Sequence, residues 1–304
     1  MNNNDDIKST ISFNKEDFLF NIKRNKLSLY STKNNDADFN KEHLSMHFEE
    51  TTKKMQELQS KLYAQAEYAL LVVIQGLDAS GKDGAIKRVM SNINPQGFTV
   101  SYFKSPTEEE LAHDYMWRCI KALPKRGCIA LFNRSYYEEV LYVRVHENIL
   151  KKQNLPGFSS ALHKSNKFWN TRMDDINNFE KYLKNNGIEV LKIFLNISKA
   201  EQKNRFLKRI NIPEKNYKFA LSDIQDRKYW DFYMGIYEDM FRRTSTKQAP
   251  WYIVPADDKV FVRYVVTNLI VDKLNMLPLN YPVISGKKKE QLDEARHMLE
   301  NEKE

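Results

Sequence analysis

Residues 69–84 join an apolar strand to a glycine-rich loop, and this junction restricts the possible folds more than any other part of the sequence. The run ALLVVIQ (69–75) is typical of a strand buried on both faces. Gly76, Gly81 and Lys82 follow in the spacing GxxxxGK, and a helical pattern begins directly after them. Such a turn directs backbone N–H groups and the positive end of the helix inward, and the lysine adds charge. The sequence therefore predicts a phosphate-binding loop in an α/β protein.

The loop carries two acids at unusual places. Loops of this form normally end in Ser or Thr, whose hydroxyl binds Mg²⁺, but Asp83 follows Lys82 here and Asp78 lies inside the loop. A carboxylate beside a phosphate is repulsive unless a divalent cation lies between them, so Asp78 and Asp83 are predicted to position Mg²⁺. Two alternatives stay open: Asp83 can cap the first helical turn, and Asp78 can form a turn with its own backbone.

Four further apolar runs repeat the strand pattern along the chain. Stretches of helical length separate them, which favours parallel pairing through right-handed crossovers. The predicted fold is a three-layer α/β fold with about five parallel strands. These runs are FTVSYFK (98–104), CIALFN (128–133), EVLKIFLNI (189–197) and WYIVP (251–255).

The chain shows no internal repeat and no flexible linker, so one domain is the simplest organisation. Residues 1–38 are predicted to form an irregular arm, residues 39–280 the domain, and residues 281–304 a charged peripheral tail. An amphipathic helix is predicted over residues 40–68, with its apolar stripe packed on the core.

Composition limits the setting and the partners. The chain of 304 residues has no apolar run near the ~20 residues of a membrane span, and its polar N-terminus lacks the apolar segment of a secretory signal. It has two cysteines without metal-binding spacing, so a cytoplasmic protein without membrane contact is expected. The net charge of +8 suits a polyanionic partner or reflects an ordinary basic surface.

The segment after the third strand is a second candidate for ligand contacts, because such folds bind ligands at the carboxyl ends of parallel strands. A metal-supporting Asp is common at this strand end, but this chain has Asn133. Glu138 can supply the missing charge together with the loop acids. Arg134 can bridge phosphates as a bidentate donor or form a surface salt bridge.

The segment after the second strand offers weaker candidates. Lys104 lies at the end of that strand. Arg118 follows Asp114 by four residues, a spacing that also suits a purely structural pair on one helix face.

Residues 198–230 concentrate basic side chains between the fourth and fifth strands. Arg205 and Arg209 are four residues apart and share a helix face, while Phe206 and Ile210 occupy the neighbouring face. Helices at this place can close over the loop as a lid (about 199–230) and exclude water. A plain solvated helix pair is the alternative. The further basic residues include Lys203, Lys208, Lys215 and Lys218.

Taken together, these segments resemble the polyphosphate kinase 2 family over roughly residues 40–275. The resemblance implies a thymidylate-kinase-like P-loop kinase fold with a helical lid, Mg²⁺ dependence and a homo-oligomer, either a dimer or a tetramer. It is carried by GLDASGKDG, FKSPTEEELAHDYMWR, NRSYYEE, FLNISKAEQKNRFLKRI, PEKNYKF and RTSTKQAPWYIVPADDK.

The resemblance also implies roles for individual residues. Asp78 and Asp83 position the metal, and Asp78, Lys82, Asp83, Arg134 and Glu138 form the expected catalytic set. Glu138 matches an acid found in only part of the family, in which Asp also often replaces Asn133, so the choice between nucleoside monophosphates and diphosphates stays open. The expected substrate-binding residues are Gly76, Ala79, Ser80, Gly81, Lys82, Lys104, Arg118, Asn133, Arg205, Lys208, Arg209 and Lys215.

The resulting functional prediction is reversible Mg²⁺-dependent transfer of the terminal phosphoryl group of inorganic polyphosphate to a purine nucleotide, such as ADP giving ATP. Two alternatives remain: an ATP-dependent kinase of small nucleotides or nucleosides, and a basic nucleic-acid-binding P-loop protein. Polyphosphate carries charge and no bases, so a row of cations with few stacking aromatics suits it better than a nucleic acid.

Overall fold

The computed structural model describes residues 13–34, 41–91 and 93–302. A five-stranded sheet in the order β2-β3-β1-β4-β5 forms the centre, and every neighbouring pair of strands is parallel. This confirms the predicted α/β fold class. The strands are β1 (Ala69–Gln75), β2 (Phe98–Tyr102), β3 (Ile129–Asn133), β4 (Ile188–Asn196) and β5 (Trp251–Pro255).

Strand limits agree with the predicted ones to within two residues. All seven residues of β1 are buried, as expected for a central strand with helices on both faces. β2, at one edge of the sheet, has no buried residue and ends at Tyr102, before the predicted limit at 104. Residues 103–104, predicted as the end of this strand, form a loop. They are apolar at Phe103 because this side chain packs into the core beside Phe132.

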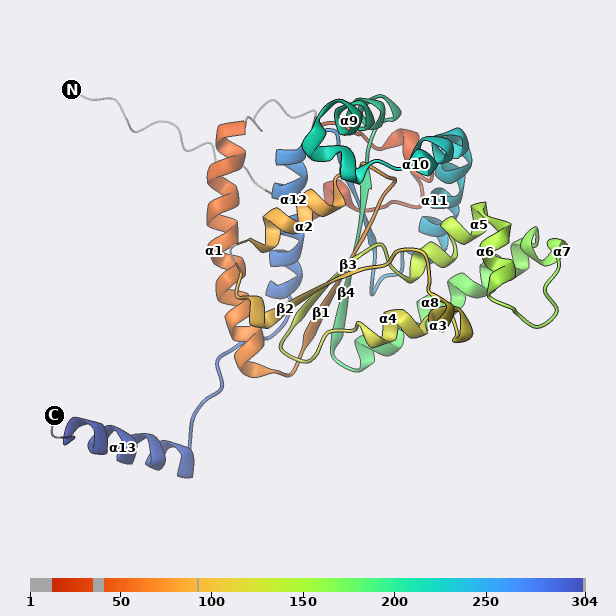
Figure 1. Ribbon diagram of the computed structural model, residues 1–304. Helices are drawn as coiled ribbons and strands as arrows, with labels where there is room; N and C mark the ends of the chain where they lie inside the picture. The colour runs from red at the N-terminus through yellow and green to blue at the C-terminus, as the bar shows by residue number, and fades with distance from the viewer. Residues whose placement is uncertain (1–12, 35–40, 92, 303–304) are drawn as a thin grey trace, which may run out of the picture.

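Helices cover both faces of the sheet (Figure 1). Helices α1, α2 and α12 lie on one face, and α8 and α11 lie on the other. The helices are α1 (Lys41–Gln65), α2 (Lys82–Met90), α3 (Glu108–Ala112), α4 (Trp117–Lys121), α5 (Tyr142–Val145), α6 (Glu147–Lys152), α7 (Ser160–His163), α8 (Asn166–Asn185), α9 (Lys199–Asn211), α10 (Leu221–Asp226), α11 (Trp230–Thr244), α12 (Lys259–Asn275) and α13 (Lys287–Glu300).

Helix α9 and helix α10 lie over the carboxyl ends of the strands, at the top of Figure 1. This is the place predicted for a lid. Phe206 and Ile210 are predicted to share one apolar face of α9. Phe206 is buried, but Ile210 is 48% exposed, so this part of the prediction is wrong for Ile210. Short 3-10 helices complete this end of the molecule: η4 (Tyr136–Glu139), η5 (Pro213–Lys218) and η6 (Arg227–Tyr229).

The described part of the N-terminal arm is packed against the domain. Phe20 is buried, and its N–H donates to the carbonyl of Trp251 at 2.8 Å. Two short 3-10 helices, η1 (Lys15–Phe18) and η2 (Leu27–Leu29), lie in this arm. The first twelve residues of the predicted arm and residues 35–38 lie outside the described residues.

The tail forms helix α13, which projects away from the sheet and its covering helices (Figure 1). All residues of α13 are exposed. Among the described residues, no helix is both long and apolar enough to cross a membrane.

Candidate active site

The glycine-rich loop lies between β1 and α2. β1 is the central strand, with β3 and β2 on one side of it and β4 and β5 on the other. Gly76 is essential to the shape of the loop, because a Cβ there would lie 2.7 Å from Ser80 Oγ and 3.0 Å from the carbonyl oxygen of Leu195. Gly81 takes the left-handed conformation (φ 104°) at the start of α2. Gly76 is therefore required because neighbouring atoms leave no room for a side chain, and Gly81 because of its left-handed backbone.

Lys82 is buried in the loop. Its Nζ donates to the carbonyl oxygens of Gly76 at 2.6 Å and Leu77 at 3.1 Å. Burial, with a contribution from nearby Arg134, lowers the pKa of Lys82 to about 8. A cation that already lies against the loop backbone is well placed to transfer its hydrogen bonds to phosphate oxygens.

The two loop acids have different partners. Asp83 Oδ1 accepts a hydrogen bond from Asn133 Nδ2 at 2.6 Å, and Asp78 pairs with Arg134. Helix α2 takes Gly81 as its N-cap, so Asp83 lies in the first turn and is not the capping residue. The amide at position 133 thus holds a loop carboxylate in place.

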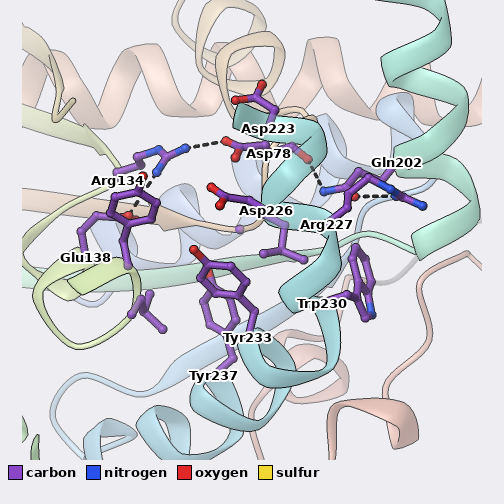
Figure 2. A pocket seen from close by; sticks show the side chains of 14 residues that line it. Asp78, Arg134, Glu138, Gln202, Asp223, Asp226, Arg227, Trp230, Tyr233 and Tyr237 are labelled. Carbon is purple, nitrogen blue, oxygen red and sulfur yellow. Dashed lines mark hydrogen bonds and ion pairs between the residues drawn. The ribbon is translucent and has the colours of Figure 1, made fainter. Parts of the chain in front are cut away.

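Arg134 joins the loop to the segment after β3. It pairs with Asp78 and, at 3.1 Å, with Glu138, and Figure 2 shows its guanidinium between these carboxylates. The two acids, with Glu138 the stronger influence, raise the pKa of Arg134 above its usual value, so it stays charged. Its backbone is left-handed (φ 65°), an uncommon conformation for a residue with a side chain, and its N–H donates to the carbonyl of Ile74.

A cavity of about 500 Å³ opens on one side of the loop. Ten Lys and Arg side chains line it, against two carboxylates, those of Asp78 and Asp83. Such a surface suits a polyanion. The basic residues are Lys82, Lys104, Arg134, Arg205, Lys208, Arg209, Lys215, Lys218, Lys259 and Arg263.

A second, smaller pocket of about 30 Å³ also borders Asp78 and Arg134, and Figure 2 shows the side chains that line it. Four aromatic side chains line it, from Tyr142, Trp230, Tyr233 and Tyr237. Its carboxylates are those of Asp78, Glu138, Asp223 and Asp226, and its cations are those of Arg134 and Arg227. The two pockets therefore have opposite charge and share the Asp78–Arg134 pair.

Sequence reasoning missed the part of the lid that lines this smaller pocket. Asp223 and Asp226 lie at the two ends of one short helical turn in LSDIQDRKYW, three residues apart and followed by aromatic residues, a spacing that places acids on one helix face. Burial raises the pKa of both carboxyls, with His146 opposing it at Asp226. The two acids are outnumbered by the basic side chains of residues 198–230, so the net charge of that segment does not reveal them.

Arg205 differs most from its expected placement on an open basic face. Its side chain is buried against the loop, and Nη1 donates to the carbonyls of Ala79 and Ser80 at 3.0 and 2.8 Å. Nη2 donates to the carbonyls of Ala256 and Asp257 at 2.7 and 3.0 Å. Its Nε donates to the carboxylate of Glu201, at the start of the same helix. Arg205 thus connects the lid helix to the backbone of two loops.

Arg118 is not among the residues that line either pocket. It pairs with Glu110 at 3.6 Å and Glu139 at 3.5 Å, and it donates to the carbonyl of Lys104 at 2.8 Å. The alternative of a structural pair with Asp114 is replaced by these contacts with Glu110 and Glu139. The other predicted residues, from Gly76 to Asp83 in the loop to Lys215 in the lid, line one or both pockets.

The donor set fits a hard divalent cation held mainly through substrate and water oxygens. Within the described ranges, no group of three or more His, Cys, Asp and Glu side chains is suited to hold a metal ion. Asp78 and Asp83 instead offer carboxylate oxygens at the border of a strongly basic cavity, and carboxylate oxygens are the donors that hard divalent cations accept.

Comparison with known proteins identifies the family. The family model described as polyphosphate kinase 2 matches residues 38–280. The chain belongs to this family. A crystal structure of polyphosphate kinase 2 from Arthrobacter aurescens TC1 has a TM-score of 0.75 and 34% identity, covering 85% of this chain and 87% of that one. The family assignment and the fold therefore agree.

Two curated relatives extend over most of the chain. The ADP-polyphosphate phosphotransferase of Rhodopseudomonas palustris is 44% identical over 259 residues, 85% of this chain and 89% of the relative. The AMP/ADP-polyphosphate phosphotransferase of Meiothermus ruber is 41% identical over 230 residues, 76% of this chain and 80% of the relative. This chain is thus an enzyme of the polyphosphate kinase 2 family.

Proposed function

We propose that this enzyme transfers the terminal phosphoryl group of inorganic polyphosphate to a purine nucleotide, reversibly and with Mg²⁺. One observation carries the proposal: a basic cavity and an acidic, aromatic pocket both border the phosphate loop and share Asp78 and Arg134. Two anionic substrates, one in each cavity, would meet end to end at that pair. This is the arrangement that in-line transfer requires.

Polyphosphate is proposed to occupy the basic cavity. A chain with about one charge per phosphate gains from many flexible cations, and the cavity supplies them from the loop, the lid and the start of α12. Lys218, Lys259 and Arg263 extend the predicted set. The terminal phosphoryl group would lie at Lys82 and the loop amides, which offset its charge during transfer.

The nucleotide is proposed to enter from the smaller pocket, with its base beside Trp230 and Tyr233. At about 30 Å³ this pocket has room for little more than a water molecule, so its lid walls in α10, η6 and α11 have to move apart to admit a nucleotide. Closure then excludes water from the transferred group, which favours transfer to the nucleotide over hydrolysis.

Asp78 and Asp83, which both line the basic cavity, would hold Mg²⁺. When bound, the ion neutralises charge on both substrates and fixes their relative orientation. Arg134, placed at the border of the pockets, would contact phosphate oxygens from either side, and Glu138 holds its guanidinium in position. No covalent intermediate with the protein is needed, since alignment and charge neutralisation account for the reaction.

The direct test incubates purified protein with ADP, Mg²⁺ and polyphosphate and measures ATP. Polyphosphate-dependent ATP formation supports the proposal, whereas phosphorylation that requires ATP as donor indicates a nucleotide or nucleoside kinase. ATP hydrolysis stimulated by DNA or RNA, without this transfer, indicates the nucleic-acid-binding alternative. The same assay with AMP, ADP, GMP and GDP determines the acceptor.

A matched pair of variants tests the loop itself. Lys82→Ala is expected to lose ~10²-fold or more in turnover while remaining folded. Lys87→Ala removes an exposed lysine from the same helix, outside both cavity linings, and is expected to match the unmodified enzyme. Equal turnover of the two variants would remove Lys82 from the mechanism.

Three finer predictions belong to the same proposal. The enzyme is expected to be a cytoplasmic homo-oligomer, dimer or tetramer, without a nucleic-acid partner. Light scattering after size-exclusion chromatography measures the subunit number, and a filter-binding assay with labelled DNA and RNA in the presence of polyphosphate tests the last point.

A further inference from the structure

Asp257, in the loop after β5, joins three parts of the chain that are distant in sequence. Its N–H donates to the carbonyl of Thr32 at 2.9 Å, and its Oδ2 accepts from Thr32 Oγ1 at 3.1 Å. Its Oδ1 accepts from the N–H of Ser198, the N-cap of α9, at 2.8 Å. Its carbonyl accepts from Arg205 Nη2 at 3.0 Å. The N-terminal arm, the lid helix and Arg205 therefore all meet at this residue.

Arg205 continues this connection to the phosphate loop. Its guanidinium is a rigid planar fork, so the carbonyls of Ala256 and Asp257 on one side fix its plane. On the other side the same group donates to the carbonyls of Ala79 and Ser80 in the loop. A shift of the Asp257 backbone would thus be transmitted to the loop that holds Lys82.

The arm is anchored where it reaches Asp257. Asn196, the last residue of β4, donates from Nδ2 to the carbonyls of Tyr30 and Ser31 at 3.1 and 3.2 Å. Ahead of this point, Phe20 is buried against Phe241. The arm therefore presents Thr32 to Asp257 from a fixed position, although residues 13–34 precede the segment that the family model matches.

We propose that Thr32 and Asp257 are positioning residues for the transfer reaction. Together they hold the first turn of α9 and the guanidinium of Arg205, and through Arg205 they fix the backbone of the phosphate loop. The arm is then part of the active-site scaffold, and it acts without touching either substrate.

The test compares three substitutions in the arm. Thr32→Val removes the hydroxyl that faces Asp257 and keeps the shape of the side chain, whereas Thr32→Ser keeps the hydroxyl. Tyr30→Phe is the matched control, because it removes an arm hydroxyl that accepts from the N–H of Asn21 at 2.8 Å, away from Asp257. Thr32→Val removes one side-chain hydrogen bond, whereas Tyr30→Phe removes the bond from the Asn21 N–H and a longer one, at 3.4 Å, that the Tyr30 hydroxyl donates to the Asn21 carbonyl.

Hydrogen–deuterium exchange of the peptides covering residues 76–84 is the first readout. Thr32→Val is expected to speed exchange there by about 2- to 10-fold, the range that corresponds to one lost hydrogen bond. Thr32→Ser and Tyr30→Phe should leave these peptides unchanged. This readout does not require turnover, so it tests the positioning role even if the proposed substrates were wrong.

Steady-state kinetics is the second readout, and it rests on the proposed function. Thr32→Val should lower kcat by a similar factor with the KM for polyphosphate within twofold, because no phosphate ligand is lost. If Thr32→Val does not fold, Asp257→Ala replaces it, since it removes both side-chain contacts and keeps the carbonyl that accepts from Arg205.

Two results would overturn the inference. Loop exchange in Thr32→Val equal to that in wild type would show that the contact does not hold the loop. Equal acceleration in Thr32→Val and Tyr30→Phe would show that the arm has only a general docking role. Failure of wild-type enzyme to use polyphosphate would instead count against the proposed function alone.

Discussion

A buried ion pair lies directly beneath η4, the segment that carries Glu138. Lys192 on β4 is fully buried and donates to Glu180 Oε2 at 2.7 Å, to Tyr137 Oη at 3.0 Å and to the carbonyl of Thr244 at 2.6 Å. The other oxygen of Glu180 accepts from the hydroxyls of Tyr136 and Tyr137 at 3.0 and 2.8 Å. Burial lowers the pKa of Lys192, and the pairing with Glu180 opposes that shift.

Replacing only the lysine leaves a carboxylate without its cation in a site that is 3% exposed. Lys192→Met is expected to lower the free energy of unfolding by about 3–5 kcal/mol, the usual cost of breaking a buried pair from one side. The double variant Lys192→Met/Glu180→Gln removes both charges and keeps an acceptor for the tyrosine hydroxyls. It should therefore recover to within about 1–2 kcal/mol of wild type.

Urea denaturation at pH 7, followed by tryptophan fluorescence, measures both changes. With a slope of about 3 kcal/mol per molar urea, the single variant should lower the midpoint by about 1–2 M. The double variant should restore most of that shift, together with the orientation of η4 and turnover. A midpoint lowered by less than about 0.3 M in Lys192→Met, or a double variant no more stable than the single one, would refute the reasoning.

Three other perturbations probe the site. Arg205→Lys keeps the charge but loses the planar fork, so kcat should fall at least ~10-fold with little dependence on salt. Lys208→Ala should instead raise the KM for polyphosphate several-fold at low salt, and the increase should shrink at high salt because salt screens the lost interaction. If both variants showed the same salt dependence, the distinction between the two residues would be wrong. A lysine loses its charge as pH rises through its pKa, so the charged fraction of Lys82 should fall from about nine-tenths at pH 7 to about one-tenth at pH 9. The Kd for polyphosphate in metal-free buffer should therefore rise about tenfold over this range. Calorimetry should detect this rise in wild type and not in Lys82→Met. Asn133→Asp places a second carboxylate beside Asp83, so Mg²⁺ should raise the Tm of this variant more than that of wild type. If Mg²⁺ raised the Tm of both proteins equally, Asp83 would not be part of the metal site.

The sheet and the phosphate loop could be predicted because their signals are local. A β-branched run followed by GxxxxGK determines the strand, the turn and the helix start within about twenty residues, and each buried strand has its own apolar run. The edge strand β2 was predicted too long for the same reason, because an apolar run does not distinguish a strand from a loop whose side chain enters the core.

The contacts of Arg205 could not be predicted from the sequence. Apart from Glu201 on the same helix, its partners are carbonyl oxygens, which every residue carries, on loops more than 50 and more than 120 positions away along the chain. Helical periodicity correctly places Arg205 and Arg209 on one face, but it does not show that the guanidinium of one of them turns to backbone acceptors. The structure therefore changes the role we propose for Arg205 from substrate contact to positioning of the loop.

The pairing of Asp78 with Arg134 explains how one site can hold two acids and two anionic substrates. In the protein alone, the guanidinium lies between Asp78 and Glu138 and offsets part of the repulsion between these two carboxylates. In the proposed complex, Asp78 would be free to hold Mg²⁺, which would supply positive charge there, and Arg134 would donate to phosphate oxygens. The left-handed backbone of Arg134, a strain of about 1–3 kcal/mol, keeps its side chain at the border of both pockets. This arrangement leaves every charge with a partner, and on this basis we expect Mg²⁺ and polyphosphate to bind cooperatively.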